Sequence, residues 1–134
     1  MNFIVLEGDS AKDFFENENV NYKEDPFIEE WLTGGDVKLY LLYENDKLKS
    51  FALLTKLNKD PLKLHSNPHY LNYIYTLEDY RRVGHALSLL KYIKNLENTT
   101  AFCTDDIAQS LFKKAEYVFN SHDEMYKFPI YRFP

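Results

Sequence analysis

The chain has 134 residues, of which 45% are hydrophobic and 28% charged, so we expect a single globular domain over residues 1–134. No apolar run approaches the roughly 20 residues of a membrane span, and the first residues do not look like a signal peptide. A single cysteine, Cys103, excludes an internal disulfide and a cysteine-built zinc site. These features predict a reducing, cytoplasmic setting with no membrane contact.

The net charge of −5 is divided unevenly along the chain. Residues 1–36 carry ten acidic and two basic side chains, a balance of −8, whereas residues 37–134 carry eleven acidic and fourteen basic ones, a balance of +3. The acidic N-terminal third argues against nucleic-acid binding, which needs a basic surface. It could attract a cationic partner such as an amine or a lysine-bearing peptide, or it could simply solvate two surface helices, which is the more common role of such charge runs.

The first half of the chain predicts a strand, two helices and a hairpin. The strand is Phe3 to Leu6, and Ser10 is the expected N-cap of a first helix carrying Phe14 and Phe15. A second helix is expected from Asp25-Pro26 to Gly34-Gly35. The hairpin joins two β-rich runs around a polar turn: Val37 to Tyr43, Leu48 to Leu57, and Glu44-Asn45-Asp46-Lys47 between them.

The second half predicts strand, helix, strand, helix and two final strands. The expected strands are His69 to Thr76, Thr99 to Thr104, Tyr117 to Phe119, and Met125 to Phe133. The buried stripe of the first of these helices is Ala86, Leu89, Leu90, Ile93 and Leu96, spaced three or four apart. The last helix, capped by Asp105-Asp106, has apolar positions at Ala108, Leu111, Phe112 and Ala115.

The most informative segment is the strand, glycine turn and helix between Tyr70 and Leu96. The first N–H groups of a helix have no partner within the helix, and the positive end of the helix dipole lies there as well. Such a corner holds phosphate without needing many lysines, and Gly84 lets the chain come close to an anion. The segment is not a Walker loop or a dinucleotide fingerprint, because the required glycines and lysine are missing.

The spacing Arg81-x-x-Gly84-x-Ala86 resembles the acyl-CoA signature [QR]-x-x-G-x-[GA] of the GNAT N-acetyltransferase superfamily. The resemblance implies an α+β fold with a central, mostly antiparallel mixed sheet of about six to seven strands and about four flanking helices. The expected order of elements agrees with that fold over nearly the whole chain. The resemblance also implies acetyl-CoA as cosubstrate, a primary amine as acceptor, and a monomer or homodimer.

By the same resemblance, strand Leu71 to Thr76 parts from strand Thr99 to Thr104, and the pantetheine arm of the coenzyme lies in the gap. Backbone groups of the first strand would contact pantetheine, one N–H would polarise the thioester carbonyl, and amides of the glycine turn would hold the pyrophosphate. The implied coenzyme contacts are Ile74, Tyr75, Thr76, Arg81, Arg82, Val83, Gly84, His85, Ala86 and Leu87.

Two positions depart from the family pattern. Asn72 aligns with a glutamate that many members use as general base, and Phe112 aligns with a tyrosine that protonates the leaving thiolate. Neither an amide nor a phenyl ring can transfer a proton in that way. Glu116 also stands where a glycine usually ends the last helix.

The catalytic candidates that remain are Tyr75, Tyr73 and Asn72. Alternation along a strand predicts Tyr73 and Tyr75 on one face and Asn72, Ile74 and Thr76 on the other. A tyrosine on whichever face lines the cleft could donate a proton, although packing also explains each one. We expect His85 to be a surface or anion contact rather than a base.

Three functions follow from these observations. The first is acetyl transfer to a small amine, a lysine or an N-terminus by direct attack, without a covalent enzyme intermediate. The second is a protein of the same fold that is catalytically weak or inactive and binds acyl-CoA or a protein partner. The third is an unrelated α+β binding module with a chance motif.

Lys113 and Lys114 could reach the outer phosphate of a coenzyme or could be ordinary exposed lysines.

Overall fold

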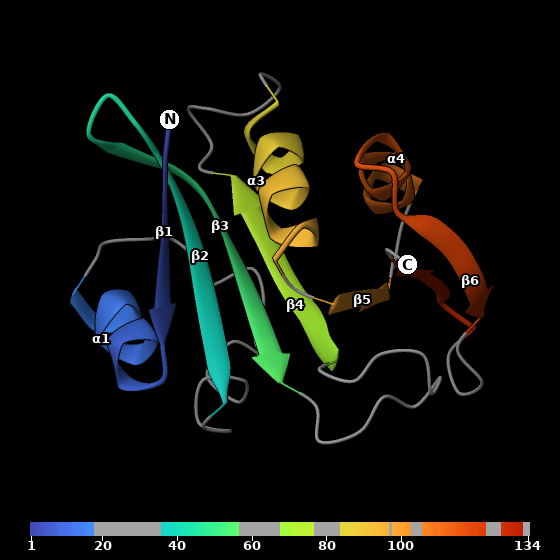
Figure 1. Cartoon of the computed structure of the whole chain (residues 1–134), viewed down its shortest axis with the longest axis horizontal. Helices are drawn as coiled ribbons and strands as arrows, with labels where there is room; N and C mark the ends of the chain where they lie inside the picture. Colours follow the sequence, from blue (N-terminus) through green and yellow to red (C-terminus); the bar gives the residue numbers. More distant parts are fainter. Residues whose placement is uncertain are drawn as a thin grey trace.

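The structure is a computed structural model that describes residues 1–17, 36–56, 68–76, 84–96, 98–102, 106–122 and 127–132. Seven strands and three helices are described within these ranges (Figure 1). They are β1 (Asn2–Glu7), α1 (Asp9–Asn17), β2 (Val37–Glu44), β3 (Lys47–Lys56), β4 (Pro68–Thr76), α3 (His85–Lys94), β5 (Asn98–Phe102), α4 (Asp106–Lys114), β6 (Val118–His122) and β7 (Pro129–Arg132). The order predicted from the sequence is confirmed for these elements. The predicted second helix lies outside the described residues.

All seven strands form one sheet in the order β1-β2-β3-β4-β5-β7-β6. β4 and β5 are parallel, whereas each of the other five neighbouring pairs is antiparallel. The predicted mixed and mostly antiparallel sheet is therefore confirmed, with three described helices where about four were expected.

The predicted hairpin is confirmed as β2 and β3, and its turn is two residues long because both strands extend one residue further into the turn than predicted. Glu44 pairs with Lys47 across the turn, and both central residues, Asn45 and Asp46, have positive φ angles of 55° and 62°. Turns of this kind match the twist of the flanking strands, and Asn and Asp tolerate the left-handed region better than most residues.

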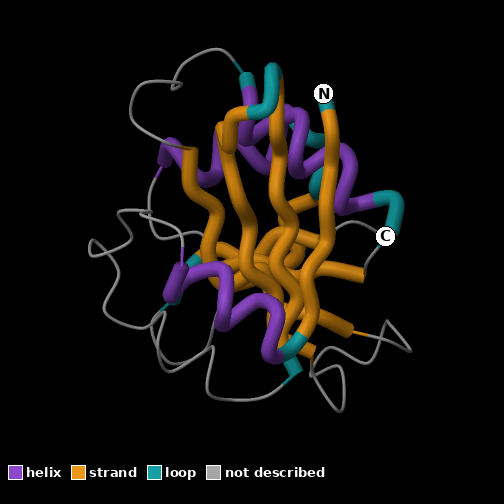
Figure 2. Tube along the Cα trace, turned by 90° about the vertical axis from the view of Figure 1, so that its left-hand side faces the viewer, coloured by secondary structure: helices purple, strands orange, loops and turns teal. Residues whose placement is uncertain are grey.

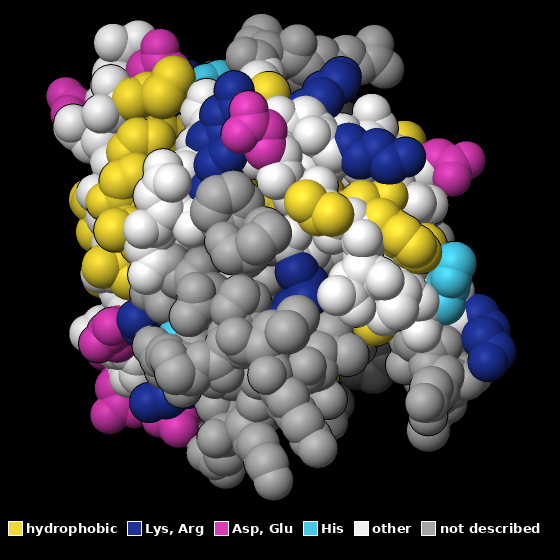
Figure 3. Space-filling model, turned by 45° about the vertical axis from the view of Figure 1, so that its right-hand side comes forward, with side chains coloured by type: hydrophobic (Ala, Val, Ile, Leu, Met, Phe, Trp, Pro, Cys, Tyr) yellow, Lys and Arg dark blue, Asp and Glu magenta, His cyan; other side chains and the backbone are white. Residues whose placement is uncertain are grey.

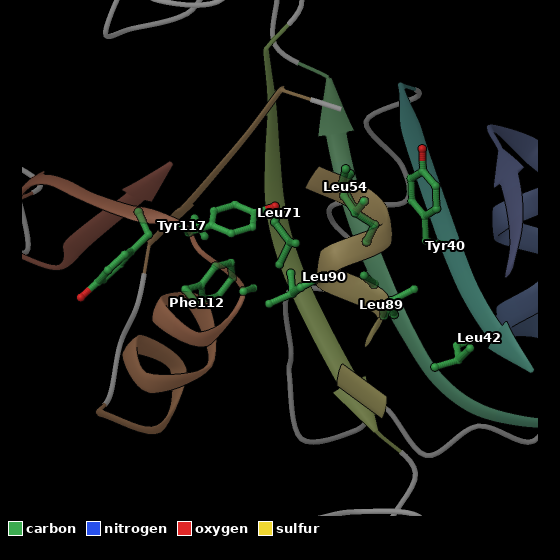
Figure 4. Close-up of a cluster of buried hydrophobic side chains, with 13 residues drawn as sticks. Tyr40, Leu42, Leu54, Leu71, Leu89, Leu90, Phe112 and Tyr117 are labelled. Carbon is green, nitrogen blue, oxygen red and sulfur yellow. The ribbon is translucent and has the colours of Figure 1, made fainter. Parts of the chain in front are cut away.

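Helices cover both faces of the sheet (Figure 2). We name the two buried clusters after the helices that cover them. The α1-side cluster consists of Ala11, Phe14, Phe15, Val37, Leu39, Leu41, Phe51, Leu53 and Tyr75. The α3-side cluster consists of Tyr40, Leu42, Ala52, Leu54, Leu71, Leu89, Leu90, Ile93, Ala101, Phe112, Ala115, Tyr117 and Tyr131 (Figure 4). Successive central residues of β2 and β3 enter opposite clusters, which explains why Leu39–Leu42 and Phe51–Leu54 are continuous apolar runs.

The stripe predicted for α3 is confirmed at its centre, because Leu89, Leu90 and Ile93 are fully buried. It is wrong at its end. The helix stops at Lys94, and Leu96 is 56% exposed. No described helix is long and apolar enough to cross a membrane.

The start of α1 also differs from the prediction. The helix begins at Asp9, and the carbonyl of Gly8 accepts hydrogen bonds from the amides of Ala11 and Lys12. Ser10 therefore lies inside the first turn and is not the N-cap. Gly8 has a φ of +56° and takes the cap position, a conformation that glycine adopts without strain.

The C-terminal end of α4 is closed by backbone hydrogen bonds. The amide of Glu116 donates to the carbonyl of Lys113 at 3.0 Å, and that of Tyr117 donates to the carbonyl of Phe112 at 2.9 Å. This is the Schellman pattern, which normally has glycine at the residue with positive φ. Here that residue is Glu116, with a φ of 69°. The positive φ explains why glycine is usual at this position in the family pattern.

Side chains complete this closure. Lys94 of α3 donates from Nζ to the carbonyl of Ala115 at 3.0 Å and lies 3.1 Å from a carboxylate oxygen of Glu116. The rings of Phe112 and Tyr117 meet edge to face with centroids 5.0 Å apart. The end of α4 is thus fixed both to α3 and to the core.

The hydroxyl of Tyr117 reaches β5, where it shares a hydrogen bond of 2.5 Å with Thr99 Oγ1. Burial raises the pKa of Tyr117 to about 12, while the hydrogen bond from Thr99 acts in the opposite direction. The phenol is therefore neutral at every physiological pH.

Candidate functional site

β4 and β5 are paired at one end and part along their length. Parallel pairing joins Pro68, His69 and Tyr70 of β4 to residues 98–100 of β5. No described β5 residue is in register with residues 71–76. The predicted parting of these strands is therefore present, and it begins directly after Tyr70.

A β-bulge lies at the same point of β4. Leu54 of β3 pairs with Leu71 and Leu53 pairs with Tyr73, so Asn72 is an extra residue. A bulge bends its strand and increases the local twist. The bulge therefore coincides with the place where β4 leaves β5.

The bulge overturns one expectation about the faces of β4. Leu71 packs in the α3-side cluster and Tyr73 packs against the α1-side cluster, which regular alternation would not allow. Asn72 Oδ1 accepts a hydrogen bond of 2.7 Å from Thr55 Oγ1, and Thr55 alternates with Leu54 and so faces the α1 side. Asn72 thus shares a face with Tyr73, not with Ile74 and Thr76 as predicted.

The N-terminal end of α3 is open. Gly84 is its N-cap, with φ 87° and ψ 15°, and no side chain caps the helix. The helical ladder begins with the amide of Ser88, which donates to the carbonyl of Gly84 at 3.0 Å. The amides of His85, Ala86 and Leu87 come before that bond and have no acceptor within the helix.

These amides border a cavity of about 690 Å³. Its described lining residues come from the end of β4, the start of α3 and one face of α4: Thr76, Gly84, His85, Ala86, Leu87, Asp106, Ile107, Ser110, Leu111 and Lys114. A Cβ atom added at Gly84 would meet no atom within 4 Å, so the chain borders open space there. A helix dipole, together with first-turn amides that have no acceptor within the helix, favours an anionic ligand at the edge of such a space.

The end of β4 is held by a buried hydroxyl. Ser50 Oγ donates to the carbonyl of Tyr75 at 2.7 Å and lies 3.1 Å from Thr76 Oγ1. Ser50 itself is fully buried. This fixes the strand end that forms one border of the cavity.

Apart from Lys114, which the sequence offered as a possible contact of the outer phosphate, the α4 wall of the cavity was not predicted. Ile107 is 83% exposed although it is apolar, because it faces the cavity rather than the core. Ile107, Ser110, Leu111 and Lys114 are spaced three or four residues apart and form a second stripe beside the core stripe. The signal that the sequence offered for this wall was Ile107, an apolar residue outside the core stripe predicted for the helix.

The prediction that His85 is a surface residue is wrong, because the residue is buried, whereas its role as an anion contact stays a prediction. His85 is buried, and its Nε2 lies 3.2 Å from Glu44 Oε2 at the end of β2. A carboxylate only accepts hydrogen bonds, so the proton is on the imidazole nitrogen. The ring thereby ties the start of α3 to the β2–β3 hairpin.

The three catalytic candidates are not among the described residues that line the cavity. Tyr73 and Tyr75 stack with ring centroids 5.9 Å apart, and both rings lie within 6.0 Å of the ring of Phe51 in the α1-side layer. Phe112, at the position of the family tyrosine, is buried in the α3-side cluster (Figure 4). The catalytic roles of Tyr73, Tyr75 and Asn72 stay predictions.

Three of the implied coenzyme contacts lie outside the described residues, namely Arg81, Arg82 and Val83. Ile74 and Thr76 lie on the cavity side of β4, and Tyr75 lies on the opposite side. Among the residues that the structure describes, no group of His, Cys, Asp and Glu could hold a metal ion.

Comparison with solved structures identifies the architecture. An aminoglycoside N-acetyltransferase in complex with CoA superposes with a TM-score of 0.66 at 15% identity, over 93% of this chain and 97% of that one. An acetyltransferase of the GNAT family from Listeria monocytogenes superposes with a TM-score of 0.59 at 14% identity, over 98% and 94% of the two chains. The chain has the GNAT fold.

A third GNAT-fold structure, the ribosomal-protein-S18-alanine N-acetyltransferase from Escherichia coli, gives a TM-score of 0.62 at 14% identity, over 98% of this chain and 90% of that one. No family sequence model matches the chain, and no curated protein matches it in sequence. At such low identity the shared property is the GNAT fold, and the chemistry of the site must be argued from the chain's own residues.

Proposed function

We propose that the chain is an acetyl-CoA-dependent N-acetyltransferase that acts on a primary amine in the cytoplasm. The observation that carries the proposal is the uncapped start of α3, which borders a cavity next to the parted strands β4 and β5. The acetyltransferases of this fold include one solved in complex with CoA, which supports the choice of coenzyme.

The residues that are present fit this coenzyme. The cavity volume of about 690 Å³ lies within the range of about 300–1,000 Å³ that is typical of ligand pockets. The amides of His85, Ala86 and Leu87 would hold the diphosphate, while Leu87, Ile107 and Leu111 offer apolar contact to the uncharged arm.

The coenzyme supplies an acetyl thioester, whose carbon is attacked by a neutral amine. A C–N bond forms, the C–S bond breaks, the amine loses a proton and the departing thiolate takes one up. The role of the chain is to align the two reactants along β4 and to direct a backbone N–H at the carbonyl oxygen as it gains negative charge. The acidic N-terminal third of the chain would favour the approach of a cationic acceptor, whether a small amine, a lysine or an N-terminus.

A second function is supported by specific observations. The Asn72 oxygen is already bonded to Thr55, and Phe112 is buried in the core. Neither position offers the base or acid that many GNAT enzymes have there. A protein with this site could bind acyl-CoA and act through a partner, with little or no turnover.

The test combines binding with turnover. Acetyl-CoA at 100 times its Kd should raise the unfolding free energy by about 2.7 kcal/mol, which a thermal shift would detect. Release of CoA should then be measured with a panel of amines, lysine peptides and peptides with free N-termini. Binding with turnover supports the transferase, and binding without turnover supports the second function. Absence of binding would refute both.

The pH profile gives a sharper view of the mechanism. If no side chain removes the amine proton, kcat/KM should rise about tenfold per pH unit until the pKa of the acceptor, about 10.4 for a lysine. A plateau well below that pH would instead reveal a general base. Whether a tyrosine of β4 protonates the departing thiolate is tested separately by the kcat of Tyr73→Phe and Tyr75→Phe.

A further inference from the structure

The cavity beside α3 has two positive features on opposite walls. One is the start of α3, with its dipole and the amides of its first turn. The other is Lys114 of α4, the only lysine or arginine among the described lining residues. Figure 3 shows the side of the molecule that carries α4 and β6, where lysine and arginine side chains lie beside exposed apolar ones.

The two charged residues of the α4 wall lie at its opposite ends. Asp106 and Lys114 both line the cavity and are eight residues apart, which is about 12 Å along the helix. Ile107, Ser110 and Leu111 lie between them on the same wall. The wall is therefore acidic at one end, mostly apolar in the middle and basic at the other, so that it favours a ligand anion near Lys114 and disfavours one near Asp106.

Coenzyme A is anionic at two separate places, its diphosphate and a single phosphate on the ribose of its adenosine. The proposed function assigns the diphosphate to the amides at the start of α3, which leaves Lys114 without a ligand group. We propose that Lys114 binds the ribose 3′-phosphate and makes the chain select coenzyme A over its 3′-dephospho form. This assignment rests on the proposed function.

The neighbouring residue Lys113 provides a matched control. Both lysines are exposed and both belong to the last turn of α4, so they interact equally with the helix dipole. Lys113 is not among the described residues that line the cavity. A difference between the two positions therefore reports the cavity and not the net charge or helix stability.

The experiment measures Kd for coenzyme A and for 3′-dephospho-coenzyme A with the unmodified chain, Lys114→Gln and Lys113→Gln. The unmodified chain should prefer coenzyme A. In Lys114→Gln the ratio of the two Kd values should be about three- to fivefold smaller, which is the upper part of the range for an exposed ion pair. Lys113→Gln should keep it. Raising the salt concentration should reduce the preference of the unmodified chain and leave that of Lys114→Gln unchanged, because salt screens exposed charges.

The outcomes separate this assignment from the function on which it rests. If Lys114→Gln binds both compounds equally more weakly, or keeps the full preference for coenzyme A, Lys114 does not recognise the ribose phosphate and the assignment is overturned alone. Equal losses in Lys113→Gln would overturn it as well, as a general effect of charge. If the unmodified chain binds neither compound, the proposed function fails and the assignment fails with it.

Discussion

Two helix ends in this molecule are treated in opposite ways. The start of α3 has a glycine N-cap, no capping side chain and amides that border a cavity. The end of α4 is closed by backbone hydrogen bonds, by Lys94 of α3 on the carbonyl of Ala115, and by an aromatic contact to the core. Polar groups at a helix end need partners, so an end that stays open beside a cavity is suited to a ligand. The closed end is a matter of stability.

The comparison predicts that changes at the open end alter ligand affinity, whereas changes at the closed end alter stability. The largest expected effect is that of Gly84→Val. A side chain there would enter the space next to the amides, and losing two charge-assisted hydrogen bonds of about 1.5 kcal/mol each corresponds to roughly a hundredfold in the Kd for acetyl-CoA. Calorimetric titration measures this change.

Gly8→Val is the matched control for Gly84→Val. Both glycines have positive φ angles, +56° and +87°, and at both an added Cβ would meet no atom within 4 Å. Both variants should therefore lose stability through backbone strain, but only Gly84→Val should lose coenzyme binding. Equal affinities in the two variants would show that the ligand does not bind at the start of α3.

Tyr117 at the closed end should give the chain a pH-dependent stability at alkaline pH. Its pKa is raised from 10.0 to about 12 in the folded state, so the protonated phenol stabilises the fold below pH 10, and this contribution is lost as the pH rises to 12. Two pKa units correspond to about 2–3 kcal/mol of unfolding free energy.

Tyr117→Phe isolates that contribution from those of the other tyrosines. Near neutral pH the variant should lose about 1 kcal/mol, because Thr99 Oγ1 is left without the phenol hydroxyl. Its unfolding free energy, measured in urea from pH 9 to 12, should fall less steeply than that of the unmodified chain. Parallel curves would contradict the burial of the hydroxyl.

Lys94→Met should reduce the unfolding free energy by about 1 kcal/mol, because the carbonyl of Ala115 loses its donor while the apolar stem of the side chain is kept. Lys91→Met is its control, since Lys91 lies in the same last turn of α3 and is exposed. Denaturant midpoints of the two variants give the difference. Coenzyme affinity should be the same in both.

The smallest effect is expected at Glu116, and it is a gain. Glu116→Gly relieves roughly 1–2 kcal/mol of left-handed backbone strain but adds about 0.5–1 kcal/mol of entropy to the unfolded chain. The net stabilisation should be close to 0.5–1 kcal/mol, measured by urea denaturation. Glu116→Ala keeps the strain and loses the contact with Lys94, so a stabilised alanine variant would disprove this account.

The regular parts of the fold were predictable because their signals are local. The hairpin around Asn45 and Asp46 combines turn residues with flanking β-rich runs. The core stripe of α3 repeats every three or four residues. The glycine turn before α3 likewise indicated an open helix start from adjacent residues alone, and its role as an anion site stays a prediction.

The parts that were missed depend on contacts that are distant in sequence. The apolar and aromatic run of β4 has no polar alternation to reveal the bulge at Asn72, which appears only in the register with β3. The partner of His85 is Glu44, 41 residues earlier. The α4 wall of the cavity is defined by its position opposite α3, and Ser10 was preferred over Gly8 because hydroxyl caps are the more common ones.

The surplus residue in β4 has an evolutionary consequence. Because Asn72 has no counterpart on β3, loss of its codon would leave every other side chain of the strand on its present face and both hydrophobic layers intact. A straighter β4 could then continue alongside β5, and the gap between them would narrow. One in-frame deletion could in that way close the gap proposed for the coenzyme while the chain still folds.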